Sequence, residues 1–274
     1  MLFVVFAVLP FTLAFGYALL YSFGIIGVVN EGFTLSFWKE VFTSGTLGTS
    51  FLYSGIIAAV GVFLSVSLAL WVVLKFKEGF NNKYLSFIIY MPLAVPGIVS
   101  AFFTYQLFAQ SGFFARLSYQ LNWIETAQQF PDLVNDNWAI GIIITFISLL
   151  TPFFILLYLN IYKDERIEEL SQLSRALGAN KKQIALKVSL PIMLKKSWVL
   201  IVLYFIFLLG AYEVPLILGQ ESPQMLSVLI LRELKQFDLT KTSEGYVMAV
   251  VYTVVIMSAT IFIFSRKKLR NNAY

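Results

Sequence analysis

Long stretches with almost no charged side chain constrain this chain more than any other feature of its sequence. A helix needs roughly 20 mostly apolar residues to cross about 30 Å of hydrocarbon. None of the stretches alternates polar and apolar residues as a barrel strand does. The sequence therefore predicts an all-α, polytopic membrane protein with six transmembrane helices in a single domain, residues 1–274. The six windows are 2–30, the later part of 41–74, 84–115, 137–162, 197–220 and 245–265.

The basic side chains are sorted between the two ends of these windows. Three of the 20 Lys and Arg residues lie in 75–83, eight lie in 163–196 and four follow Phe264, whereas five lie in the alternate connections. The positive-inside rule places the basic segments and both termini in the cytoplasm. The net charge of +5 is then explained by topology and by anionic membrane lipid. Nucleic-acid binding is therefore not expected.

The residue types in the chain exclude most catalytic chemistry. With no His and no Cys among its 274 residues, it cannot form disulfides, thiol nucleophiles, imidazole bases or Cys and His metal sites. No Gly-x-x-x-x-Gly-Lys-[Ser/Thr] phosphate loop occurs in the sequence. We expect no catalytic residues, no metal and no cofactor, so the chain is not expected to be an enzyme.

The connection between the fourth and fifth windows, residues 163–196, has its own helical pattern. Ile167, Leu170, Leu173 and Leu177 recur at spacings of three, three and four, which places them on one face of a short helix. Gly178 then fits a left-handed C-terminal cap. The pattern predicts that the helix ends at a sharp corner.

A second short helix is predicted directly after that corner. Asn180 is followed three residues later by Gln183, as in a capping box, and Pro191 is expected to interrupt the helix. The corner itself is 177–180. A hairpin of this kind can lie on lipid or bind a partner protein, and its spacing alone leaves both interpretations open.

The run from Gln172 to Pro191 resembles the loop that defines the permeases of ATP-binding-cassette importers. In that loop Glu-Ala-Ala is followed by Gly four positions after the last Ala, and later by an aliphatic residue, one spacer, Leu and Pro. Gln172, Leu173 and Ser174 stand at the opening triad and depart from it. The positions that match are Gly178, Ala179, Val188, Leu190 and Pro191.

This resemblance implies a type I importer permease, with six helices and a coupling helix between the fourth and fifth. It implies ATPase subunits as partners, together with a second permease subunit, identical or homologous, and a periplasmic or lipid-anchored solute-binding protein. It places the chain in the bacterial cytoplasmic membrane. The residues it implies for ATPase docking are Gln172, Leu173, Ser174, Leu177, Gly178, Ala179 and Asn180, with Val188, Leu190 and Pro191 as structural positions of the loop.

Two prolines interrupt the third window. Pro92 and Pro96 lie one turn apart and remove two backbone donors, so we expect a kink or an unwound turn there. The kink can serve gating or packing alone. Gln106, near Thr104 on the same window, can line a polar pathway or hydrogen-bond between helices.

Glu213 is the one acidic or basic side chain inside the six windows. A carboxylate near the middle of a membrane helix is costly, so we expect Glu213 to face a translocation pathway, with Tyr212 beside it. A position at the outer interface and a structural contact are the alternatives. The surrounding segment 210–228 resembles permeases of the polyamine, ferric-iron, thiamine and phosphonate group. A small charged solute, a polyamine first, is the resulting prediction. The alternative to an ATP-driven importer permease is a self-contained secondary carrier or channel.

Overall fold

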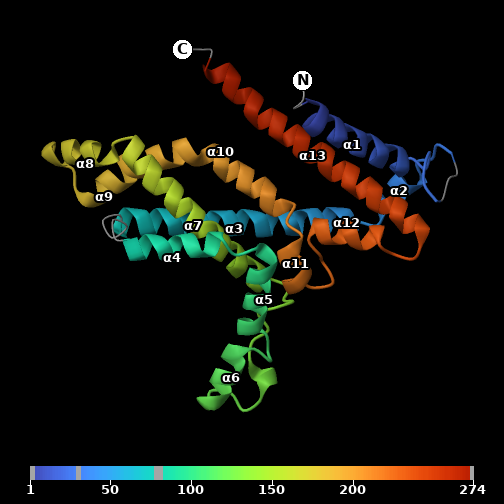
Figure 1. Ribbon diagram of the computed structural model, residues 1–274, viewed down its shortest axis with the longest axis horizontal. Helices are drawn as coiled ribbons and strands as arrows, with labels where there is room; N and C mark the ends of the chain where they lie inside the picture. The colour runs from blue at the N-terminus through green and yellow to red at the C-terminus, as the bar shows by residue number, and fades with distance from the viewer. Residues whose placement is uncertain (1–3, 29–31, 77–82, 272–274) are drawn as a thin grey trace. The chain divides into compact units, whose positions relative to one another are not determined.

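The computed structural model describes residues 4–28, 32–76 and 83–271, and every regular element within these ranges is helical (Figure 1). This confirms the predicted all-helical class. Contacts between the helices divide the chain into two compact units, and the prediction of one domain over 1–274 stays a prediction. Unit 1 comprises Met1–Tyr53 and Pro223–Tyr274, and unit 2 comprises Ser54–Ser222.

Four helices are long and apolar enough to cross a membrane. They are α3 (Thr46–Phe76), α7 (Ile140–Asp164), the continuous helix Lys181–Leu209 and the stretch Leu239–Ile263 of α13 (Leu239–Asn271). Each overlaps one of the predicted windows. The chain is thus consistent with a multi-pass membrane protein, while the count of six spans is not confirmed.

The first window contains a shorter helix than predicted. After the π-helical turn η1 (Val4–Val8), α1 (Leu9–Ser22) has 14 residues. A helix of that length rises about 21 Å, less than the hydrocarbon thickness of about 30 Å. Both predicted ends of this window, residues 2 and 30, lie outside the described residues, as does most of the basic segment 75–83.

The third window is broken at its prolines. Its arms, Phe87–Leu93 of α4 (Lys83–Leu93) and the stretch beginning with α5 (Gly97–Phe108), meet at 102°. Pro96 has an extended backbone, with φ −59° and ψ 148°, and it directly precedes α5. The predicted interruption is therefore confirmed, and the window counts as a fifth span only if both arms belong to one crossing.

The fifth window begins earlier and ends earlier than predicted. The chain stays helical from α9 (Lys181–Ile184) through the π-helical η4 (Ala185–Ser189) into α10 (Leu190–Leu209), so Pro191 does not interrupt it. A proline removes a donor and clashes with the carbonyl four residues before it, and the wider π turn accommodates both effects. After Leu209 the chain breaks and restarts as α11 (Glu213–Leu218).

Helix α7 forms the centre of unit 2. Its side chains Phe146, Phe154 and Tyr158 are fully buried. The Tyr158 hydroxyl lies 3.1 Å from the Ser197 hydroxyl of α10, and Thr145 of α7 donates to Thr104 of α5 at 2.8 Å. Polar side chains thus join α7 to both neighbouring helices inside the apolar core.

Unit 1 has a separate core. It is formed by α2 (Ser36–Thr43), the start of α3, α12 (Leu226–Leu234) and α13. The amphipathic helices α2 and α12 bury their apolar faces against α13. The buried members of this core are Phe37, Val41, Leu47, Leu226, Leu229, Val247 and Met248.

Candidate functional site

The corner between α8 (Ile167–Ala176) and α9 has a tightly specified backbone. Gly178 has φ +87°, and its N–H donates to the Arg175 carbonyl at 2.9 Å. The next N–H, of Ala179, donates to the Ser174 carbonyl at 3.0 Å. These two bonds form a Schellman motif, which satisfies carbonyls at the end of α8. The predicted left-handed cap is confirmed.

The start of α9 is equally well defined. The Asn180 side-chain oxygen accepts from the Gln183 backbone N–H at 2.8 Å, and the Gln183 side-chain oxygen accepts from the Asn180 N–H at 2.9 Å. This is the predicted capping box. The corner 177–180 is therefore held by hydrogen bonds on both sides.

The apolar stripe of α8 becomes more exposed toward the corner. Ile167 is fully buried, whereas the exposed fraction is 39% for Leu170, 61% for Leu173 and 82% for Leu177. Gln172 is also exposed, and Ser174 and Ala179 are half-buried. Exposed leucine side chains that lack a partner within the described chain are typical of a surface that binds another protein or lies on lipid.

The base of the hairpin is attached to the membrane helices. Lys196 Nζ of α10 lies 2.6 Å from Glu165 Oε1 at the end of α7, and the Tyr162 hydroxyl of α7 donates to Glu168 of α8 at 2.7 Å. The loop positions Val188 and Leu190 are half-buried, and Pro191 is exposed in the first turn of α10. Side-chain contacts therefore join the base of the hairpin to α7 and α10.

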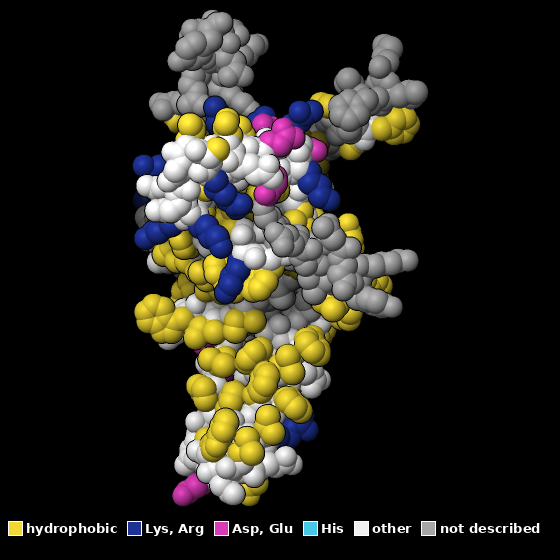
Figure 2. Space-filling view, turned by 90° about the vertical axis from the view of Figure 1, so that its left-hand side faces the viewer, with side chains coloured by type: hydrophobic (Ala, Val, Ile, Leu, Met, Phe, Trp, Pro, Cys, Tyr) yellow, Lys and Arg dark blue, Asp and Glu magenta, His cyan; other side chains and the backbone are white. Residues whose placement is uncertain are grey.

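The hairpin presents a basic surface. Lys and Arg side chains gather over the end of unit 2 that carries α8 and α9, with a smaller group of Asp and Glu side chains beside them, and hydrophobic side chains cover the adjoining surface (Figure 2). A recess of about 140 Å³ lies behind α8, with Arg175 and Lys181 among its lining residues. This distribution fits a segment that faces the cytoplasm beside anionic lipid.

The break in the third window borders an apolar cavity. The cavity has a volume of about 440 Å³. It is lined by Met91 and Pro92 of α4, by Val95 at the break, by α5 residues and by Ile144, Ser148 and Leu149 of α7. Gln106 is exposed on α5. Thr104 accepts an interhelical hydrogen bond from Thr145. Hydrogen bonding between helices is the second of the two roles predicted for polar side chains of this window.

Glu213 lies beside this break. It is the first residue of α11, is exposed, and its Oε2 atom accepts a hydrogen bond from the Ile98 backbone N–H of α5 at 3.1 Å. Tyr212 is half-buried at the N-cap position of α11. The predicted pathway residues Glu213 and Pro96 are thus close together, although the sequence contains no signal that pairs positions so far apart.

Comparison with known proteins adds one finding. A family model described as "Binding-protein-dependent transport system inner membrane component" matches residues 61–266, about three quarters of the chain. The chain belongs to this family. No curated protein matches the sequence.

Family membership makes the chain a permease subunit of an ATP-binding-cassette importer, a transport system with ATPase and binding-protein partners. The matched region contains the hairpin, both helix breaks and most of α13. The predicted resemblance is therefore confirmed at the level of the family.

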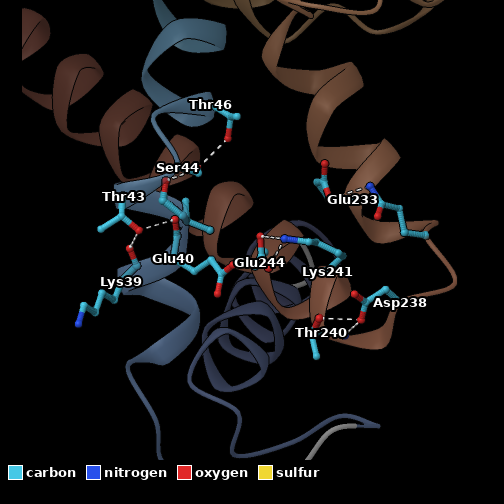
Figure 3. A network of polar contacts seen from close by, with 12 residues as sticks. Lys39, Glu40, Thr43, Ser44, Thr46, Glu233, Asp238, Thr240, Lys241 and Glu244 are labelled. Carbon is cyan, nitrogen blue, oxygen red and sulfur yellow. Dashed lines mark hydrogen bonds and ion pairs between the residues drawn. The ribbon is translucent and has the colours of Figure 1, made fainter.

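Unit 1 of the permease contains a second polar network, in the connection predicted to be external (Figure 3). Lys241 Nζ lies 2.7 and 2.9 Å from the two carboxylate oxygens of Glu244, which is buried. Glu233 of α12 is also buried and accepts from Gln236 at 2.9 Å. Because the Glu233 and Glu244 carboxylates both accept hydrogen bonds from neighbouring side chains, the network stabilises the turn between α12 and α13.

The turn itself is capped by Asp238. Its carboxylate accepts from the backbone N–H of Thr240 at 3.0 Å and from the Thr240 hydroxyl at 2.6 Å. These hydrogen bonds hold the pKa of the Asp238 carboxyl below its ordinary value. Sequence reasoning missed this cap, whose signal was the Asp238-Leu-Thr240 pattern before a long apolar run.

Proposed function

We propose that this permease carries a small charged solute across the bacterial cytoplasmic membrane, driven by ATP that a separate subunit hydrolyses. The observation that supports the proposal most is the corner 177–180. It combines a hydrogen-bonded backbone, an exposed leucine face and, at the base of the hairpin, side-chain contacts to α7 and α10. Such a lever converts closure of an ATPase into movement of membrane helices.

In this proposal the chain performs no catalysis. It has no phosphate loop, and ATP is bound and hydrolysed on the partner that docks at Leu177, Gly178, Ala179 and Asn180. Gln172, Leu173 and Ser174 extend the docking surface along α8. A second permease subunit, identical or homologous, completes the pathway, and a binding protein delivers the solute from the outer side.

The proposed orientation follows the basic residues. Both termini and the hairpin face the cytoplasm, and the connections 110–136 and 221–244 face outward. Within unit 2, the cation-rich surface over α8 and α9 supports this orientation.

A polyamine is the solute we favour. Glu213 is an exposed carboxylate at a helix break between apolar segments, and a polycation is the solute that gains most from such a group. Tyr212, Pro92, Pro96 and Gln106 are the further residues proposed to line the pathway. Ferric iron, thiamine and phosphonate are the competing solutes, and phosphonate would be repelled by the carboxylate.

Purification of the tagged permease from its native membrane tests the central part of the proposal. We expect a stable complex that contains a subunit with a phosphate loop and hydrolyses ATP, and a Walker-lysine variant of that subunit should abolish uptake. Solute uptake by the permease alone in liposomes, driven by an ion gradient, would instead favour a secondary carrier or channel.

A further inference from the structure

We propose that Glu213 is a positioning residue, which caps the N-terminus of α5 and thereby holds the break of the third window in its bent arrangement. The proposal concerns a contact between α11 and α5 within unit 2. It rests on the proposed function only for its transport measurement.

The first turn of α5 lacks a local cap. Its N-cap residue is Pro96, whose side chain has no acceptor, and no side-chain cap bond is formed there within the described residues. The N–H of Ile98 is therefore satisfied by Glu213, which lies 115 positions away in the sequence, at 3.1 Å. A carboxylate at this position also interacts favourably with the positive end of the helix dipole.

Gly97 allows the carboxylate to come this close. A Cβ atom placed on Gly97 would lie 3.2 Å from Glu213 Oε2 and 3.8 Å from Val214 Cγ2. The first distance is shorter than most contacts of a real Cβ atom, so a larger side chain would push the carboxylate away. Pro96 thus leaves the start of α5 without a cap of its own. Gly97 leaves room for a carboxylate from a distant part of the sequence to supply that cap.

Two helix breaks meet at this contact. Glu213 begins α11 after the break that follows Leu209, and Ile98 is the second residue of α5, which begins after the break that follows Leu93. A change in the 102° angle between the arms of the third window moves Ile98 relative to α11. Such a change breaks the hydrogen bond, so the cap stabilises the bent arrangement and must open if the arms straighten.

The surroundings leave room for such a change. The cavity of about 440 Å³ is lined by residues of both arms, so neither arm is fully packed on that side. The exposed position of Glu213 makes the cap accessible to water or to a cation. A cationic solute that pairs with Glu213 would compete with the Ile98 N–H for the same carboxylate.

A cysteine pair tests the contact in the assembled complex. The chain has no Cys, so Gly97→Cys with Val214→Cys introduces the only two thiols of the permease. A Cβ atom on Gly97 would lie 3.8 Å from Val214 Cγ2, so the two introduced side chains are expected to be in contact. We expect rapid cross-linking under mild oxidant, and absence of cross-linking would overturn the arrangement.

Variants at Glu213 in the parent chain, which keeps Gly97, test the cap itself. Glu213→Gln keeps an acceptor oxygen, so hydrogen exchange of the Ile98 amide should stay within about twofold of the parent, whereas exchange in Glu213→Leu should be at least about threefold faster. Equal exchange rates for all three would refute the positioning role. Membrane abundance of each variant checks folding, and the exchange measurement needs neither solute nor ATP hydrolysis, so it remains readable if the proposed function fails.

The transport measurement tests whether the cap opens during the cycle. Oxidised Gly97→Cys/Val214→Cys complex should lose uptake and regain it after reduction, with either single-cysteine variant as the control. Normal uptake by the fully cross-linked complex would show that α5 and α11 do not separate during transport.

Discussion

Gly178 controls the corner through its backbone alone. Its φ of +87° is unfavourable for a side chain, while nothing lies within 4 Å of the position that its Cβ would occupy. Gly178→Val should therefore add about 1–3 kcal/mol of backbone strain at the corner without causing a steric clash. We expect loss of solute-stimulated ATP hydrolysis in the assembled complex.

Gly178→Asn is the matched control, because Asn tolerates positive φ better than a β-branched residue. It should retain most of the stimulation. If solute stimulates ATP hydrolysis normally in a complex that contains Gly178→Val, the docking assignment is wrong.

Glu213 makes a second prediction at the residue scale, on the solute. Glu213→Gln removes the charge but keeps the shape and an acceptor for Ile98, so uptake of a polyamine should slow by about tenfold while the complex still assembles. Uptake kinetics in a complex of normal abundance give the measurement. Unchanged kinetics would remove Glu213 from the pathway, together with the reason to favour a polyamine.

Residues close together in the sequence were easier to predict than residues brought together by folding. The Gly178 cap and the Asn180–Gln183 box follow local rules, and both are present. The Glu213–Ile98 hydrogen bond depends on how α11 packs against α5, and no local pattern encodes it.

At the scale of elements, prolines indicate helix breaks unevenly. Pro92 and Pro96 predicted the break of the third window. The break after Leu209 falls within an apolar run that hydropathy passed over, and its local signal is Pro215, the third residue of α11. Pro191 predicted a break that is absent, because η4 absorbs the proline within a continuous helix.

The capping box gives a prediction for α9. Asn180→Ala removes the acceptor for the Gln183 N–H and should cost about 1 kcal/mol of local stability, whereas Asn180→Asp should keep it. Hydrogen exchange of the Gln183 and Ile184 amides in the purified permease measures the effect, with faster exchange expected only in the alanine variant. Equal protection in both variants would mean that the box does not stabilise the corner.

At the scale of the whole molecule, four of the six predicted spans contain helices long and apolar enough to cross a membrane, and the other two are not confirmed as spans. Windows that contain α3, α7, α10 and α13 became long helices, since composition and length suffice for them. The first window has too short a helix, and the third is bent. Hydropathy measures transfer into lipid and does not register where a helix ends or turns.

Topology is a prediction at this scale. Lys181→Cys on the hairpin should react with a membrane-impermeant thiol reagent only after the cells are opened. Phe237→Cys, at a fully exposed position in the 221–244 connection, should react in intact cells. Labelling of the Lys181 variant from outside intact cells would show that the orientation is the reverse of the predicted one.

The central claim is that the corner 177–180 docks an ATPase subunit, and a photo-crosslinking amino acid at Leu177 tests it most directly. Leu177 is 82% exposed, and Trp123, 75% exposed in the connection predicted to be external, provides the control position. Ultraviolet irradiation of the native complex should join the Leu177 probe, but not the Trp123 probe, to the subunit that carries the phosphate loop. Capture of that subunit from Trp123, or no capture from Leu177 in an intact complex, would contradict the account.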